Sequence, residues 1–151
     1  FMACLSVGYP SPDAELEMLE RREGRDPLDS VQKVTDAATI ERFVQTVHRI
    51  HAATAVKRYI LDLVAATRAT PALRLGASPR ASVQLLRAAK AVAALSGREY
   101  VIPDDVQMLA HPVLCHRLIL SPQARAGGQT TASVVDDVLA SVPVPSPHHV
   151  S

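Results

Sequence analysis

The sequence predicts an all-α domain, a small bundle of five to six short helices with one short two-stranded ribbon. The first observation is composition: apolar residues make up 48% of the 151 residues, 23 residues are alanine, and only 3% are aromatic. Alanine and leucine favour helices, whereas strands favour aromatic and β-branched side chains. The second observation is that prolines and capping residues divide the chain into segments, within which apolar residues recur at helical spacing.

The first helix is expected to begin at Pro12 and to run to about Arg22, stopping before Gly24. Ser11 would be its N-cap, because serine is a favoured capping residue and proline suits the first helical position. Residues 26–35 are expected to form an extended linker.

Two further helices follow, and the first has Asp36 as its expected N-cap. Its apolar residues recur at i, i+3, i+4, i+7 and i+10, which predicts a half-buried helix: Ile40, Phe43, Val44, Val47 and Ile50. The second repeats this pattern from Val56 to about Thr70, where Pro71 ends it.

The next helix is expected to begin at Pro79 after a Ser78 cap and to run to Ser96, with Gly97 as the residue that ends it. Its expected apolar side consists of Val83, Leu86, Ala89 (or the stem of Lys90) and Ala93, and Leu85, Val92 and Leu95 are expected to widen it. Its expected polar side consists of Arg80, Gln84, Arg87 and Lys90.

The remaining elements are shorter. Residues 99–102 are expected to be extended and to pair with a strand at residues 117–120. A helix is expected from Pro103 to about Ala110, and Pro112 is expected to restart a short turn. After Gly127 and Gly128 a last helix is expected at residues 131–141, followed by a proline-rich tail.

Composition also excludes several classes of protein. A formal net charge of +1 argues against a general nucleic-acid binder, and no apolar run approaches the length of a membrane span. Cys4 and Cys115 lie far apart, as free thiols of a cytoplasmic protein do. The start at Phe1 lacks the basic region and the long apolar stretch of a signal peptide. The chain also begins without an initiator methionine, so we expect it to be a fragment of a longer protein.

No enzyme signature is present: neither a phosphate-binding glycine loop nor a zinc-protease or serine-hydrolase motif occurs. The histidines do not suggest a metal site. His48 is expected to point to solvent and His51 towards the core, while the faces of His111 and His116 diverge.

Arg80 is the one residue that suggests chemistry. It is expected in the first turn of its helix, where a cation is mildly unfavourable for stability. A guanidinium beside the free N–H groups of a helix start is, however, well suited to binding a phosphate. A charge placed against local stability often marks a functional site.

Several sequence blocks resemble the C-terminal part of MoxR-type AAA+ ATPases, in the family's order and over nearly the whole chain. The blocks are Ser6-Val7-Gly8-Tyr9-Pro10, Tyr59-Ile60-Leu61-Asp62-Leu63-Val64, Ala66-Thr67-Arg68, residues 75–82 (LGASPRAS), residues 100–106 (YVIPDDV) and His116-Arg117-Leu118. The resemblance implies that residues 11–142 form a helical lid subdomain. Residues 1–10 would be the last strand and hinge of a preceding core, and residues 143–151 a flexible tail.

The resemblance also implies roles for particular residues. Arg80 matches the sensor-2 arginine, which contacts the γ-phosphate of ATP, and Ser78 and Pro79 would set its helix. Tyr59 and Ile60 are candidates for contact with the adenine.

The family's Walker A, Walker B and arginine-finger residues have no counterpart in this sequence, so this chain alone is expected neither to hydrolyse ATP nor to bind it appreciably. ATP and Mg would be held by the core. The resemblance further implies a ring, hexameric in form, and a chaperone-like role in maturing client proteins alongside von Willebrand factor A domain partners.

Two other functions compete with this interpretation. The first is a stand-alone helical interaction module without a nucleotide role. The second is a DNA-binding domain with Arg80, Arg87 and Lys90 on a recognition helix, against which the near-zero net charge argues.

Overall fold

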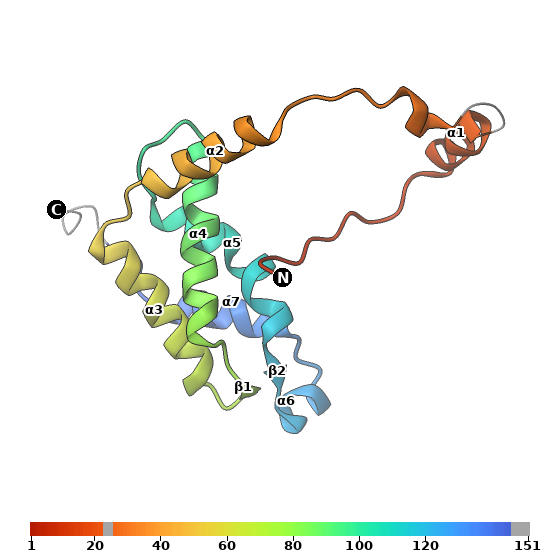
Figure 1. Ribbon diagram of the computed structural model, residues 1–151. Coiled ribbons are helices and arrows are strands. Elements are labelled where there is room, and N and C mark those ends of the chain that lie inside the picture. The colour runs from red at the N-terminus through yellow and green to blue at the C-terminus, as the bar shows by residue number, and fades with distance from the viewer. Residues whose placement is uncertain (23–25, 146–151) are drawn as a thin grey trace. The chain divides into compact units, whose positions relative to one another are not determined.

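The structure is a computed structural model that describes residues 1–22 and 26–145, and it confirms the all-α class (Figure 1). Seven α-helices and two 3-10 turns occur in these residues. In chain order the elements are α1 (Pro12–Arg22), η1 (Pro27–Ser30), α2 (Ala37–Arg49), α3 (Thr54–Ala69), β1 (Leu73–Leu75), α4 (Pro79–Leu95), α5 (Pro103–Leu114), η2 (Cys115–Arg117), β2 (Ile119–Leu120), α6 (Pro122–Ala126) and α7 (Thr131–Ser141).

The chain divides into two compact units. Residues 5–43 form the leading unit, and residues 1–4 together with the chain from Val44 onward form the main unit. Each unit is described by itself.

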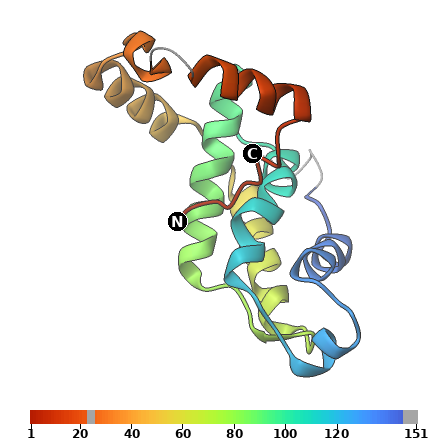
Figure 2. The same cartoon turned by 90° about the vertical axis from the view of Figure 1, so that its right-hand side faces the viewer.

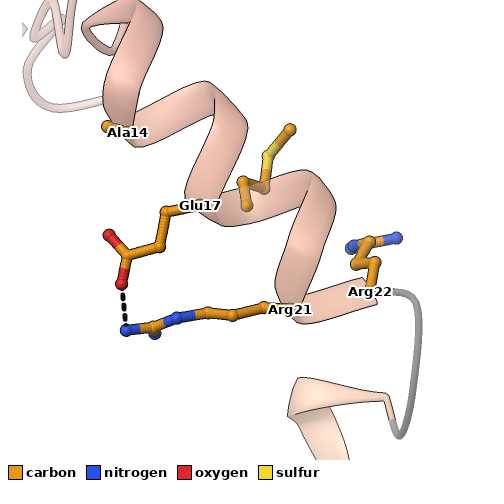
Figure 3. Close-up of a pocket in the computed structure, with 5 residues that line it drawn as sticks. Ala14, Glu17, Arg21 and Arg22 are labelled. Atoms are coloured by element: carbon orange, nitrogen blue, oxygen red, sulfur yellow. Dashed lines mark hydrogen bonds and ion pairs between the residues drawn. The ribbon is translucent and has the colours of Figure 1, made fainter.

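The leading unit contains α1, which spans Pro12–Arg22 of the described residues; the expected stop before Gly24 lies outside them. The amide of Ala14 donates to Ser11 Oγ over 3.3 Å, which confirms the serine cap. On the exposed surface of the helix, Arg21 donates to Glu17 Oε1 over 2.5 Å (Figure 3). Residues 26–35 are not extended throughout, because η1 forms a single 3-10 turn at Pro27–Ser30.

Helix α2 begins where the Asp36 cap was expected, and its apolar stripe is open to solvent. The amide of Thr39 donates to Asp36 Oδ1 over 2.7 Å. None of the α2 residues is buried, and Phe43 is 60% exposed. The prediction of a half-buried helix is therefore wrong, because burial starts only at Ile50, one residue beyond the end of α2.

The core of the main unit lies among α3, α4, α5 and α7. In Figure 1, α4 runs between α3 and α5. Helix α7 packs against α3 and α5. Leu63, Leu85 and Leu114 are almost completely buried. Burying one such side chain contributes about 1.5–3 kcal/mol, so this cluster supplies the main stabilisation of the unit.

The buried side of α4 matches the expected apolar side in part. Its buried row is Ala81, Leu85, Ala89 and Ala93, at intervals of four residues, and the last three were expected there. Val83 is 50% exposed, whereas Gln84, expected on the polar side, is 9% exposed. Three alanines in the buried row let neighbouring helices approach α4 closely, and this places the core against the alanine row. Gly97 follows the helix with a φ of 71°, which confirms its expected role as the terminating residue.

Helix α5 continues through Pro112 to Leu114, so the expected restart at Pro112 is wrong. Proline inside a helix removes one backbone donor. The carbonyl of Pro112 accepts a hydrogen bond from the Cys4 amide over 2.8 Å, which attaches the start of the chain to α5.

The expected two-stranded ribbon exists, but residues 99–102 are not one of its strands, so the predicted partner of the strand near residue 120 is wrong. Strand β2 pairs antiparallel with β1, with Leu73 opposite Leu120 and a bulge between Leu73 and Leu75. Tyr100 instead forms an isolated parallel bridge with His51. The exposed position of His51 also corrects the expectation that it faces the core, whereas His48 is exposed as expected. Figure 2 shows the ribbon at the end of the main unit where α4 begins.

Residues 1–10 contain neither helix nor strand. The Arg117 guanidinium donates to the carbonyls of Phe1 and Met2. Helix α7 spans the expected residues 131–141. Of the tail, residues 146–151 lie outside the described chain. Among the described helices, none combines the length and apolar character that crossing a membrane requires.

Candidate functional site

The first turn of α4 presents Ser78, Pro79 and Arg80 together on the surface, and all three residues are exposed. Ser78 occupies the N-cap position with an extended backbone (φ −78°, ψ 165°), and Pro79 is the first helical residue. Ser78 was predicted correctly as the N-cap residue, but its side chain makes no capping hydrogen bond. The stiff start of the helix comes from Pro79 and from the loop before it.

No hydrogen bond or ion pair holds the Arg80 side chain within the part of the chain that the structure describes. The helix dipole does not favour it there either, because a cation in a first turn is mildly unfavourable. The guanidinium is therefore available to an anion from outside this chain.

The loop before α4 is fixed to the end of α3 by residues that the sequence analysis assigned no role. The amide of Ala77 donates to Thr67 Oγ1 over 3.0 Å, and Arg68 Nε donates to the Ala77 carbonyl over 2.7 Å. Gly76 lies so close to α3 that a Cβ there would stand 2.5 Å from the Thr67 carbonyl oxygen. The sequence contained these residues in the blocks that resemble the family, but nothing in their spacing indicated the contact.

Ile60 lies near this region, in an apolar pocket between α3 and α4. The pocket has a volume of about 220 Å³ and is lined by Lys57, Ile60, Leu61, Ser82, Val83 and Leu86. Ser82 and Val83 belong to the same helix start as Arg80, two and three residues further on. The Ser82 hydroxyl oxygen is buried and has no hydrogen-bond partner in the described chain.

Tyr59 is not brought to this pocket. Its side chain is 2% exposed, and its hydroxyl accepts a hydrogen bond from Gln107 Nε2 of α5 over 3.1 Å. This is the environment of a core tyrosine with a satisfied hydroxyl. Its expected contact with adenine stays a prediction.

A second cluster of polar side chains joins α5 to α7. His111 Nε2 lies 2.8 Å from Asp136 Oδ1, and His111 Nδ1 lies 3.7 Å from the Cys115 thiol. Burial raises the pKa of Cys115, which keeps the thiol protonated and makes it a poor nucleophile. Throughout residues 1–22 and 26–145, no group of three or more histidine, cysteine, aspartate or glutamate residues could hold a metal ion.

Lys90, which the DNA-binding alternative used, donates to the His48 carbonyl at the end of α2 over 3.0 Å. This bond ties α4 to α2. Of the three basic residues that this alternative used, Lys90 makes a structural contact, whereas Arg80 and Arg87 are exposed.

The match to known families covers this region. Residues 65–138 match the AAA lid domain family, from the end of α3 through α4 and α5 into α7.

Relatives extend the likeness along the chain. It is 37% identical over 145 residues to the uncharacterised protein YeaC of Bacillus subtilis, covering 96% of this chain and 45% of YeaC. It is 32% identical over 154 aligned residues to the chaperone MoxR1 of Mycobacterium tuberculosis, covering 96% of this chain and 40% of MoxR1. The chain thus spans less than half the length of these relatives.

A solved structure has the same fold. The crystal structure of a candidate ATPase from Cytophaga hutchinsonii superposes with a TM-score of 0.84 at 29% identity, covering 97% of this chain and 47% of that chain. Residues 65–138 of the chain therefore form an AAA lid domain. More particularly, nearly the whole chain is related to part of the MoxR-type AAA+ proteins.

Proposed function

We propose that this chain closes over an ATP molecule held by the core of a MoxR-like ATPase, and that Arg80 senses the γ-phosphate. The observation that carries the proposal is the position of Arg80, exposed and without a partner in the first turn of α4. A guanidinium can bind two phosphate oxygens at once, and removal of the γ-phosphate removes the charge that it binds. Arg80 would thus distinguish ATP from ADP.

The pocket beside Arg80 supports a nucleotide as the ligand. Ile60 and Leu86 give it apolar walls suited to the face of a flat ring, and Lys57 also lines it. An apolar surface of this kind is suited to packing against a heterocycle such as adenine. The base would lie on the α3–α4 surface and the phosphates near Arg80, with Ser78 and Pro79 fixing the start of the helix.

The hydrolytic chemistry would belong to the core. This chain contains no Walker motif, so ATP and Mg would be held elsewhere in the complete protein. An arginine contributes to phosphoryl transfer by stabilising charge on the transferred group. The lid would then report the state of the nucleotide to neighbouring subunits of a hexameric ring.

The wider role that we propose is a cytoplasmic, chaperone-like ATPase that matures or assembles client proteins. The relative named chaperone MoxR1 supports this role. Von Willebrand factor A domain proteins are the proposed partners.

The test is the Arg80→Ala variant of the complete ATPase. We expect ATP turnover to fall about 100-fold, because a preorganised donor to the transition state is lost. The matched control is Arg87→Ala, which removes an exposed arginine from the same helix and should leave turnover unchanged. Circular dichroism should show the same helix content in both variants. Wild-type turnover in Arg80→Ala would overturn the sensor role and leave the interaction-module alternative.

A further inference from the structure

The backbone immediately before α4 is bonded to α3 at both of its polar groups. Thr67 is completely buried near the end of α3; its hydroxyl donates to the Val64 carbonyl over 2.7 Å and accepts from the Ala77 amide over 3.0 Å. Arg68 takes the other group, since its Nε donates to the Ala77 carbonyl over 2.7 Å. Ala77 itself is 1% exposed. Its peptide groups therefore have no access to water as a substitute partner.

Close packing completes the attachment. A Cβ at Gly76 would lie 2.5 Å from the Thr67 carbonyl oxygen and 2.8 Å from Arg68 Cα. Real Cβ atoms do not approach a backbone so closely, so only glycine lets the loop lie directly on α3. Gly76, Thr67 and Arg68 thus hold one short stretch of backbone from three directions; we name these three residues the α3 clamp.

The α3 clamp bears on Arg80 through the backbone that leads into α4. The Arg80 side chain has no bonding partner among the described residues, so its reach depends on the backbone that carries it. That backbone begins three residues earlier, at Ala77, and Pro79 between them has a fixed φ. If Ala77 moved, the first turn of α4 would move with it, because only Ser78 and the stiff Pro79 lie between Ala77 and Arg80.

We infer that the α3 clamp positions Arg80 for the γ-phosphate, so that α3 and the sensor arginine move as one rigid piece. This inference rests on the proposed function. The three residues of the α3 clamp are positioning residues, because they act through the Ala77 backbone and not on the nucleotide. The role of Arg68 is to hold the Ala77 carbonyl and not to bind phosphate.

Two pairs of variants test the α3 clamp in the complete ATPase. Thr67→Val keeps the shape of the side chain but removes the hydroxyl, whereas Thr67→Ser keeps the hydroxyl. Arg68→Ala removes the bond to Ala77, whereas Arg68→Lys keeps a donor. We expect kcat to fall about three- to tenfold in Thr67→Val and Arg68→Ala, because each loses one hydrogen bond and the alignment that it gives. Thr67→Ser and Arg68→Lys should recover most of this loss.

A second readout separates positioning from general destabilisation. The affinities for mant-ATP and mant-ADP should become more alike in Arg68→Ala, because only the γ-phosphate contact is weakened. Loss of folded protein would lower both affinities equally. Adding Arg68→Ala to Arg80→Ala should cause no further loss of turnover, because the clamp acts only through Arg80. The matched control is Arg58→Ala, which removes an exposed arginine from α3, the helix that carries Arg68, and should behave as wild type.

The outcomes distinguish the two proposals. If Arg80→Ala lowers turnover while Thr67→Val and Arg68→Ala keep wild-type turnover and nucleotide discrimination, the clamp is wrong and the sensor stands. If Arg80→Ala has no effect, the sensor and the clamp that depends on it are both overturned. Should Thr67→Val fail to fold, the exposed Arg68 still decides the question. Full additivity of Arg68→Ala with Arg80→Ala would also contradict the clamp.

Discussion

Asp105 shows how one buried carboxylate can fix the connection between two helices. It is 2% exposed and accepts hydrogen bonds from both terminal nitrogens of Arg98, at 2.8 and 2.5 Å, and from the Ile102 amide at 2.9 Å. The hydrogen bonds with Asp105 raise the pKa of Arg98. The residues between α4 and α5 are held by this carboxylate, since Arg98 also donates to the Tyr100 carbonyl.

We expect Asp105→Ala to lower the free energy of unfolding of this chain by about 2–3 kcal/mol, because its buried partners lose their acceptor. The measurement is urea denaturation followed by circular dichroism. Asp104→Ala is the matched control: this neighbouring residue is exposed in the same first turn, and its loss should cost less than about 1 kcal/mol. Equal effects of the two substitutions would show that the Asp105 bonds contribute no net stability.

At the scale of elements, the start of α2 gives a pH-dependent cap. The Thr39 amide donates to Asp36, and this hydrogen bond lowers the pKa of Asp36 below its ordinary value of 3.8. Because the pKa of Asp36 is lowered in the folded state, the cap stabilises the fold at pH values above the ordinary pKa of 3.8. This contribution is lost as the pH falls through the lowered pKa.

The Thr39 amide resonance should therefore titrate with a midpoint below 3.8 in an NMR pH series, and α2 should lose helicity over the same range. Asp36→Asn retains a capping oxygen without an ionisable group, so the same resonance should no longer titrate there. A midpoint at or above the ordinary value would contradict the cap, as would an unchanged titration in Asp36→Asn.

The elements also show which parts of the fold local sequence determines. The bounds of α1 and α7 were predictable, because capping residues, prolines and turn glycines act within a few residues. The buried side of α4 could be predicted only in part. Alanine is a weak marker of burial, and the larger side chain of Val83 shifted the predicted apolar side towards a residue that is 50% exposed. The partner of β2 was not predictable either, because strand pairing between Leu73 and Leu120 depends on how α4 and α5 fold back.

The candidate site divides in the same way. Arg80 could be predicted, because a cation at a helix start breaks a local rule that the sequence displays. The α3 clamp could not, because Thr67 and Ala77 are ten residues apart and meet only after the turn through β1 has formed. Tyr59 and Ile60 are neighbours in sequence and are both 2% exposed, but only Ile60 also lines the α3–α4 pocket, and helical spacing alone did not separate them.

At the scale of the whole molecule, the site offers an ATP molecule few contacts: one arginine, one helix start and one open apolar pocket. Hydrogen bonds to charged groups contribute about 1.5–3 kcal/mol each, whereas the entropic cost of association is about 4–15 kcal/mol. We therefore expect the contacts of this chain to fall short of that cost unless a core holds the other phosphates. The proposed lid would then gain its affinity for nucleotide only as part of the complete protein.

We therefore expect the isolated chain to bind ATP no more tightly than millimolar. In an NMR titration with ATP and Mg, the amides of residues 78–82 should show no saturable shift at micromolar nucleotide. The Arg80→Ala chain is the control, and it should give the same small, linear response. Saturable shifts at micromolar ATP that Arg80→Ala abolishes would mean that α3 and α4 form a complete nucleotide site, and that the division of binding between lid and core is wrong.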